Sequence, residues 1–198
     1  SNSENRPVFT GVNIKAEDHV LTAVATDSYR LSRKTVEIEE DIQFNVTIPA
    51  SNLYEVVKSV SDNTDVIVCV SDKLVQFYVG ATLIQSRLID GLFPDVNRLI
   101  PSDFAFELTV NAHEMINAVD RSSFLKSEGY WTVKLEASSD EVMISSKAQE
   151  IGSSEEVINA LGYKGGALRI SFSGRYLIEA LKSFKSDIVK ISFVGEMA

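Results

Sequence analysis

The chain has 198 residues, of which 44% are hydrophobic, and its formal net charge is −9. This length allows one or two domains with a buried core, and no apolar run approaches the ~20 residues that a membrane-spanning helix needs. The acidic balance excludes a generally basic nucleic-acid coat, although a local basic patch, which matters more for DNA binding, stays compatible with it.

The first part of the chain, residues 8 to 48, is predicted to form β structure. An apolar run extends from Val20 to Val24. From position 36 to 48, hydrophobic residues occupy even positions only: Val36, Ile38, Ile42, Phe44, Val46 and Ile48. A period of two predicts a strand pair with one buried face. The acidic residues Glu37, Glu39, Glu40 and Asp41 lie within it. We expect them to form a solvated edge and turn rather than a metal site.

Pro49 ends this region, and a helix is predicted after it. Ser51 or Asn52 can serve as its N-cap, and Leu53, Val56, Val57 and Val60 follow at helical spacing. Strands are then expected over residues 65–70, 74–79 and 83–89. The single cysteine, Cys69, lies in the first of these strands and is predicted to be a core residue. A lone cysteine excludes an internal disulfide framework and is typical of a reducing compartment, so we expect a cytoplasmic protein.

The segment from Pro94 to Pro101 is predicted to be a domain boundary, because it separates two similar β/α patterns. After it comes a strand, then a helix that Asn111 caps with Glu114 three residues on. Its predicted inward stripe is Met115, Ala118, Val119 and Ser122. A hairpin is expected around residues 138–140, a polar loop over residues 148–156, a last helix capped by Ser173 and a final strand over residues 187–194.

An internal repeat links the predicted helices. Leu53-Tyr54-Glu55-Val56-Val57-Lys58-Ser59 is similar to Leu177-Ile178-Glu179-Ala180-Leu181-Lys182-Ser183, and Met115-Ile116-Asn117-Ala118-Val119 is a weaker middle copy. Leu53, Met115 and Leu177 lie 62 residues apart each time. The repeating unit is therefore a helix followed by strands, and such units need neighbours to bury their apolar faces.

Two short motifs carry a resemblance to a known family. The first is Ala25-Thr26-Asp27-Ser28-Tyr29-Arg30-Leu31, and the second is Leu88-Ile89-Asp90-Gly91-Leu92-Phe93-Pro94-Asp95. Together they resemble the DNA polymerase III beta subunit, the bacterial sliding clamp. The resemblance implies an α+β DNA-clamp fold of repeated helix-plus-antiparallel-sheet units with the helices on one face. It identifies residues 1–97 as part of the second clamp domain, without its N-terminal helix, and residues 98–198 as the third, without its C-terminal strand.

The resemblance also implies a function and partners. In this family a ring of two protomers joined head to tail encircles double-stranded DNA without sequence preference. A peptide-binding pocket tethers the replicative DNA polymerase, the clamp loader and repair proteins. The resemblance implies neither cofactor nor metal. Because the first domain is absent here, a closed homodimer ring is not expected for this chain alone.

The site residues that the resemblance implies fall into three sets. The ring interface would involve Phe124 and Leu125 and the strand near residues 142–146. The DNA-facing channel would involve Lys58, Arg175, Lys182 and Lys185. The peptide-binding pocket would be formed by Thr26, Ser28, Tyr29, Arg30, Leu31, Pro94, Arg98 and Leu99.

The helical repeat gives independent support for a basic face. At 100° per residue, Lys58 and Lys182 point the same way from their helices. Asp120 takes the corresponding place in the middle copy, where Arg121 and Lys126 are candidates to compensate. From the residues alone, an ordinary solvated helix face is the favoured explanation of these lysines, and only the resemblance reverses that preference.

Two other classes of function must be compared with a clamp. An enzyme would need a catalytic constellation, and only Asp27 and Asp95 can be imagined as paired carboxylates. Both also suit turns, and His19 and His113 lack metal-ligand spacing. We therefore expect no catalytic activity. The remaining alternative is a generic β-rich protein-interaction module without a role on DNA.

Overall fold

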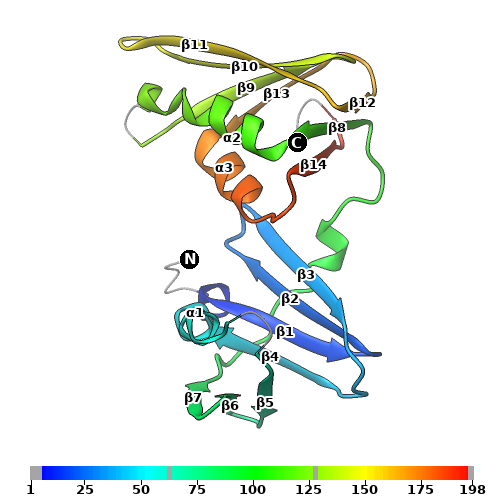
Figure 1. Cartoon of the computed structure of the whole chain (residues 1–198), viewed down its shortest axis with the longest axis vertical. Helices are drawn as coiled ribbons and strands as arrows, with labels where there is room; N and C mark the ends of the chain where they lie inside the picture. Colours follow the sequence, from blue (N-terminus) through cyan, green and yellow to red (C-terminus); the bar gives the residue numbers. More distant parts are fainter. Residues whose placement is uncertain (1–5, 62–63, 127–128, 196–198) are drawn as a thin grey trace. The chain divides into compact units, whose positions relative to one another are not determined.

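The computed structural model describes residues 6–61, 64–126 and 129–195. It divides the chain into two compact units, residues 1–95 and 96–198, and each contains antiparallel sheets and helices (Figure 1). The division falls inside the proline-flanked segment that the sequence marks as a boundary.

The first unit has two sheets and one α-helix in its described part. The larger sheet has the order β3-β2-β1-β4, and the smaller has the order β5-β6-β7. Helix α1 (Ala50–Ser59) follows β4 directly and packs against β1 and β4. The strands are β1 (Gly11–Glu17), β2 (Val20–Thr26), β3 (Leu31–Glu37), β4 (Phe44–Pro49), β5 (Val66–Val70), β6 (Leu74–Val79) and β7 (Thr82–Arg87).

The second unit has the sheets β11-β10-β9-β13 and β12-β8-β14, with helices α2 (Ala112–Asp120) and α3 (Gly174–Lys182) packed side by side (Figure 1). Short 3-10 turns at Asn97–Leu99 and Ser123–Leu125 complete it. The strands are β8 (Phe106–Asn111), β9 (Thr132–Ala137), β10 (Glu141–Ala148), β11 (Gly152–Asn159), β12 (Gly162–Lys164), β13 (Leu168–Ser173) and β14 (Ile188–Phe193).

The predicted repeat is confirmed by the positions of the helices. They begin at Ala50, Ala112 and Gly174, so each start lies 62 residues after the previous one. Each helix follows at once on a six-residue strand, which is β4, β8 or β13. In the sheet β3-β2-β1-β4, strand β1 pairs with β4, which precedes α1. In the sheet β11-β10-β9-β13, strand β9 pairs in the same way with β13, which precedes α3. The predicted fold class, repeated helix-plus-antiparallel-sheet units, is therefore confirmed.

The helices of the second unit follow their predicted sequence signals. The side chain of Asn111 accepts a hydrogen bond from the Glu114 N–H at 3.0 Å, and that of Ser173 accepts one from the Tyr176 N–H at 3.5 Å. Each thus satisfies an amide that has no partner inside the helix. The predicted stripe on α2 is buried, with Met115, Ala118 and Val119 at 0% exposure.

Helix α1 differs from its prediction. It begins at Ala50, with Pro49 at the N-cap position and no capping side chain, so Ser51 and Asn52 lie inside the helix. The Asn52 amide instead donates to the Ser86 hydroxyl on β7 at 2.7 Å, which joins α1 to the smaller sheet. Val57, predicted to be part of the buried stripe, is 61% exposed.

The predicted polar loop over residues 148–156 is wrong, because β11 (Gly152–Asn159) occupies its second half. This strand pairs with β10 along its whole length and lies at the edge of its sheet. An edge strand with one solvated side needs few apolar residues, and this explains why a run rich in serine and glutamate forms a strand.

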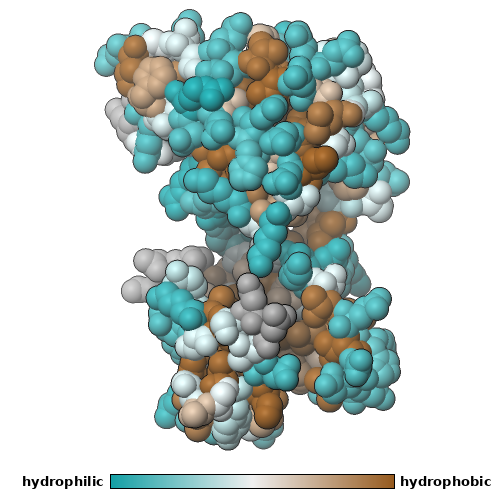
Figure 2. All heavy atoms as spheres, in the orientation of Figure 1, coloured by the Kyte–Doolittle hydropathy of each residue, from teal (hydrophilic) through white to brown (hydrophobic). Residues whose placement is uncertain are grey.

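Two further burial predictions are wrong. Cys69, predicted to be core, is exposed, as are Ile67 and Val68 beside it on β5, so neither face of the middle of this strand is covered in the described structure. Ile38 and Ile42 lie between β3 and β4 rather than in a strand, and β3 is exposed along nearly all its length. In Figure 2, hydrophobic residues accordingly show at several places on the surface of the first unit.

Candidate functional site

The turn between β2 and β3 contains the first sequence motif, and Asp27 organises it. The strands end in register with Thr26 opposite Leu31. The Asp27 carboxylate accepts the backbone N–H groups of Tyr29 and Arg30, each at 3.1 Å, and the Arg30 Nε–H at 3.1 Å. The Thr26 hydroxyl donates to the Arg30 carbonyl at 2.7 Å and accepts the Ser28 N–H. The turn is therefore held by the motif's own side chains.

The charge of Asp27 is stabilised by this arrangement. Partial burial works to raise the pKa of Asp27, but the hydrogen bonds from Tyr29 and Arg30 and the charge of Arg30 outweigh it and lower that pKa. Ser28 adopts a positive φ of 75°, a strained conformation for a residue other than glycine. Tyr29, at the tip, is 84% exposed. The turn thus presents its aromatic ring to solvent on a fixed backbone.

The second motif, residues 88–95, is fixed to the first unit at several points. The Ile89 N–H donates to the Thr47 carbonyl at 2.8 Å. Phe93 packs edge-on against Phe9, with ring centroids 6.3 Å apart. Gly91 has a φ of 119°, which favours glycine, and a Cβ there would lie 3.2 Å from the Val8 side chain. Pro94, predicted to line the peptide pocket, follows this anchored stretch and is exposed.

The predicted pocket draws its residues from both units. Thr26, Ser28, Tyr29, Arg30, Leu31 and Pro94 belong to the first unit, whereas Arg98 and Leu99 belong to the second. Leu99 is 70% exposed in a short 3-10 turn. The structure brings the first five together in one turn, and the convergence of that turn with Pro94, Arg98 and Leu99 stays a prediction.

The predicted channel cations differ in how they are paired. Lys58 contacts Glu55 at 3.0 Å, and its ammonium lies 4.4 Å from the centre of the Tyr54 ring. Arg175 contacts Glu179 at 2.9 Å. Lys182 and Lys185 are exposed, and within the described ranges no carboxylate pairs with either of them. These two lysines therefore have the most available positive charge of the set.

On α2, the expected compensation for Asp120 by Arg121 does not occur. The Arg121 guanidinium forms a bidentate pair with Glu156 of β11, with Nε to Oε1 and Nη2 to Oε2 both at 2.8 Å. Its charge is thereby neutralised. Lys126 is exposed. The basic character of the paired helices in this unit therefore rests on α3.

The predicted ring-interface residues have opposite environments. Phe124 is 58% exposed, whereas Leu125 is 3% exposed because it packs beneath β10 and β11. In the strand near residues 142–146, Val142, Ile144 and Ser146 are buried as well. Leu125 therefore presents almost no side-chain surface in this structure, and its place in the ring interface stays a prediction. Phe124 keeps such a surface, and its role there stays a prediction.

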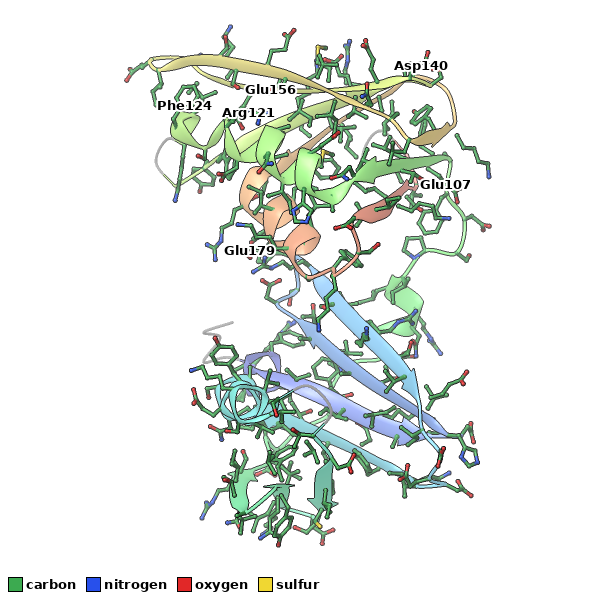
Figure 3. The ribbon with its side chains drawn as sticks, viewed as in Figure 1. Glu107, Arg121, Phe124, Asp140, Glu156 and Glu179 are labelled. Atoms are coloured by element: carbon green, nitrogen blue, oxygen red, sulfur yellow. The ribbon has the colours of Figure 1, made fainter. Side chains whose placement is uncertain are left out.

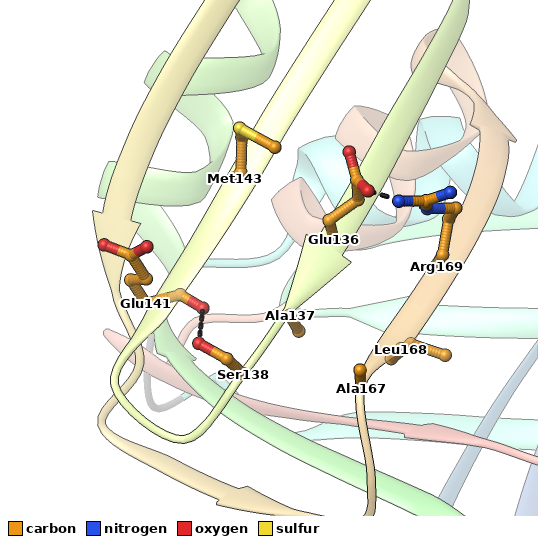
Figure 4. Close-up of a pocket in the computed structure, with 8 residues that line it drawn as sticks. All are labelled: Glu136, Ala137, Ser138, Glu141, Met143, Ala167, Leu168 and Arg169. Atoms are coloured by element: carbon orange, nitrogen blue, oxygen red, sulfur yellow. Dashed lines mark hydrogen bonds and ion pairs between the residues drawn. The ribbon is translucent and has the colours of Figure 1, made fainter.

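Two surface cavities of the described structure lie one in each unit. One, of about 390 Å³, lies over β9, β10 and β13, where Glu136 contacts Arg169 at 2.7 Å (Figure 4). Glu136 also contacts Lys134 at 2.8 Å. The hydrogen bonds from Lys134 and Arg169 lower the pKa of Glu136. The other cavity, of about 690 Å³, lies between residues 42–46 and 68–72. No group of three or more His, Cys, Asp or Glu in the described part could hold a metal ion.

Comparison with known families divides the chain where the structure does. Residues 1–95 match the model of the DNA polymerase III beta subunit, central domain, and residues 97–198 match that of its C-terminal domain. The chain belongs to the DNA polymerase III beta subunit family. The resemblance seen in the two sequence motifs is thereby confirmed.

Individual members of the beta subunit family agree with this assignment. The chain is 41% identical over 202 residues to the beta sliding clamp of Bacillus subtilis (strain 168), and 39% identical over 200 residues to that of Staphylococcus aureus (strain Mu50). Both alignments cover 100% of this chain and 53% of the relative. The chain therefore spans about half the length of these curated relatives.

Solved sliding clamps have the same fold. The DNA polymerase sliding clamp from Bacillus subtilis aligns with a TM-score of 0.94 at 40% identity, over 98% of this chain and 53% of that one. The beta subunit from Streptococcus pyogenes aligns with a TM-score of 0.93 at 32% identity, over 99% and 54%. No helix in the described ranges is long and apolar enough to cross a membrane.

The sequence pattern did not indicate one surface, the open edge of β11 in the described structure. Its signal is a weak period of two, in which Ser154, Glu156 and Ile158 are more buried than the residues between them. Only Ile158 of those three is apolar, so the hydrophobic pattern alone does not separate this strand from a loop.

Proposed function

We propose that this chain acts, within a longer protein, as part of a sliding clamp that encircles double-stranded DNA without sequence preference. The observation that supports it best is the match of the whole chain to the central and C-terminal domains of the DNA polymerase III beta subunit. In this proposal residues 1–97 are a partial second clamp domain and residues 98–198 a partial third. The longer protein is a cytoplasmic homodimer ring, which this chain alone does not close.

The proposed DNA contacts are electrostatic. Lys58, Arg175, Lys182 and Lys185 form the channel set, and we expect Lys182 and Lys185 to contribute most, because Lys58 and Arg175 already pair with Glu55 and Glu179. Contacts to phosphates carry no sequence information, and this agrees with a clamp that must move along any sequence.

A salt titration tests the DNA contacts. We expect the chain to bind duplex DNA weakly, and Lys182→Ala to lower the salt slope by roughly one unit because one phosphate contact is lost. Lys164→Ala, which changes an exposed lysine at the end of β12, is the matched control. Tight, salt-insensitive or base-specific binding would contradict the proposal.

The proposed tethering site is a cleft formed by Thr26, Ser28, Tyr29, Arg30, Leu31, Pro94, Arg98 and Leu99. Leu31, Leu99 and Pro94 supply apolar surface, and the two arginines supply donors at its rim. Such a cleft suits a short peptide with leucine or phenylalanine anchors. The partners we propose are the replicative polymerase, the clamp loader and repair proteins, which would compete for one site.

Titration of a hydrophobic clamp-binding peptide into the longer protein tests this site. Leu31→Ala should weaken binding by ~2 kcal/mol or more if Leu31 is a hot spot. Val36→Ala, which lies on the same strand and is 43% exposed, is the matched control and should change little. Equal losses from both variants would refute the pocket. Peptide binding without DNA binding would favour a generic β-rich interaction module.

We also propose that the protein has no catalytic activity. The Asp27 carboxylate, one of the two acids considered for acid–base chemistry, is occupied by two backbone N–H groups and a guanidinium. A carboxylate whose pKa is lowered in this way is a weak general base at neutral pH. Substrate turnover abolished by Asp27→Ala would contradict this.

A further inference from the structure

Helices α1 and α3 carry a carboxylate at the same position of the internal repeat. Glu55 of α1 is equivalent to Glu179 of α3, whereas the equivalent residue of α2 is Asn117. The position three residues further on divides in the same way, because it is lysine in α1 and α3 but Asp120 in α2. The carboxylate therefore occurs in the two helices that carry a channel lysine and not in the third.

Each of these carboxylates holds a cation of the channel set. The Lys58 ammonium lies 3.0 Å from Glu55 Oε1, and Arg175 Nε lies 2.9 Å from Glu179 Oε1. Glu55 pairs with the residue three places ahead of it, whereas Glu179, shown on α3 in Figure 3, pairs with the residue four places behind it. What the two helices share is therefore the carboxylate beside a channel cation, not one particular spacing.

Both ion pairs lie in solvent. The side chains of Lys58 and Glu55 are 52% and 63% exposed, and those of Arg175 and Glu179 are 70% and 41% exposed. Exposed pairs on a helix contribute little to stability. Each cation can be reached by an anionic ligand, but its carboxylate then lies close to that ligand as well.

We propose that Glu55 and Glu179 are positioning residues that weaken DNA binding, a role that rests on the DNA contacts proposed above. Each holds a channel cation on its helix and competes with a DNA phosphate for it. A phosphate that takes Lys58 from Glu55 leaves that carboxylate without its cation and next to another negative charge, and like charges repel. Weak phosphate contacts of this kind suit a clamp that must move along DNA.

The competition has a signature in the salt dependence of binding. A lysine without a carboxylate partner releases counterions from DNA when it contacts a phosphate, and this steepens the salt slope by roughly one unit. Lys58 must first leave Glu55, and the freed carboxylate then takes up a cation from solution. This uptake offsets the release, so Lys58 should add little to the slope while Glu55 is present. Lys182, with which no carboxylate pairs in the described ranges, should add the full unit.

A salt titration of this chain with labelled duplex DNA, followed by fluorescence anisotropy, tests the competition. Glu55→Gln and Glu179→Gln should each bind DNA more tightly, with a salt slope steeper by roughly half to one unit. The gain in affinity should therefore grow roughly twofold to fourfold as salt falls from about 200 mM to about 50 mM. A role in helix stability alone predicts the opposite sign, because a frayed helix would hold its cations less well.

Glu141→Gln is the matched control for the change in net charge. Glu141 is exposed on β10, and its neighbours Val142 and Ile144 are buried in the core that α3 also enters. Successive residues of a strand point to opposite faces, so Glu141 lies on the far face of the sheet from α3, where salt screens its charge. This variant should leave the slope unchanged. In a Lys58→Ala background, Glu55→Gln should lose most of its effect.

Lys182→Ala separates a failure of this role from a failure of the proposed function. If Lys182→Ala lowers the slope but Glu55→Gln and Glu179→Gln behave like Glu141→Gln, the DNA contacts are supported and the competition is overturned. Weaker binding by the two glutamine variants would also overturn it, because the pairs would then serve the helices alone. If Lys182→Ala and both glutamine variants leave the slope unchanged, the proposed DNA contacts fail, and the competition fails with them.

Discussion

Helices α1 and α3 begin at equivalent places in the repeat but bury different residues. Ile178 and Leu181 of α3 are 7% and 4% exposed, whereas the equivalent residues of α1, Tyr54 and Val57, are 60% and 61% exposed. Helix α3 packs beside α2, and α1 packs on β1 and β4 without a second α-helix in the described part of its unit. The neighbours of a helix, as much as its own pattern, decide which face is buried.

The first residue of each helix also depends on the neighbours of that helix. It is alanine in α1 and α2 but Gly174 in α3. A Cβ at Gly174 would lie 2.6 Å from the Trp131 ring, whose Nε1–H donates to the Ser122 hydroxyl at 3.0 Å. The ring is therefore held in place where it leaves no room for a side chain at the start of α3.

The largest predicted effect comes from replacing Leu181 of α3 with alanine, compared with the same replacement at Val57, the equivalent residue of α1. Leu181→Ala should destabilise the second unit by about 2–5 kcal/mol, because it leaves a cavity between α3 and its neighbours. Val57→Ala should cost less than about 0.5 kcal/mol, since that side chain is mostly solvated. Trp131, the single tryptophan, reports unfolding of the second unit, and far-ultraviolet circular dichroism follows the whole chain. Equal losses of stability in the two variants would refute the conclusion that the neighbours of a helix decide which of its faces is buried.

Gly174→Ala should have the next largest effect, about 1–3 kcal/mol, because the added methyl group must displace Trp131 or α3. The reciprocal change at the equivalent place, Ala50→Gly, should cost at most about 1 kcal/mol. Tryptophan fluorescence in urea measures the first change and circular dichroism the second. A neutral Gly174→Ala would mean that the ring moves aside without cost.

Helix capping gives a smaller contrast between the units. Asn111→Ala should cost about 1 kcal/mol, because the Glu114 N–H loses its acceptor. Ser51→Ala, within α1, should change stability by less than about 0.5 kcal/mol, since α1 has no capping side chain. The urea midpoints of the two variants measure these losses of stability. A comparable loss in Ser51→Ala would mean that Ser51 caps α1, as the sequence predicts.

The smallest predicted effect concerns pH. The pKa of Asp27 is lower in the folded chain than in the unfolded one, so its stabilising contribution is fully present above the ordinary aspartate pKa of ~3.9. That contribution is lost as the pH falls through the folded pKa. Asp27→Asn should therefore flatten the dependence of the urea midpoint on pH below about 4. An unchanged pH profile would mean that the turn contributes no such linkage.

These contrasts also explain what the sequence can and cannot predict. The caps Asn111 and Ser173 and the α2 stripe are local signals, and the structure confirms them. The exposure of Cys69 and Val57 depends on which strand or helix lies beside them, and their own segments contain no such information. Asp27 was correctly interpreted as a turn residue, because an acid can accept amides two and three residues ahead.

In the candidate sites, too, features set by nearby residues were predicted, whereas features that join distant parts of the chain were not. The motif residues Thr26 to Leu31 form one turn, as short-range side-chain chemistry requires. The pairing of Arg121 with Glu156 joins residues far apart in the chain, and helical spacing alone placed Arg121 among the candidate cations. The open edge of β11 went unnoticed because its sequence is polar.

The pairing of β14 with β8 has a consequence for synthesis of the chain. Phe193, in the last strand, pairs with Phe106, in the first strand of the same unit. By contrast, the larger sheet of the first unit is complete at Pro49. As the chain leaves the ribosome, the first unit can therefore start folding early, while β8 must wait for its partner. During that interval the edge of β8 that pairs with β14 stays open, although β12 can already pair with its other edge, and contacts so distant in sequence form slowly.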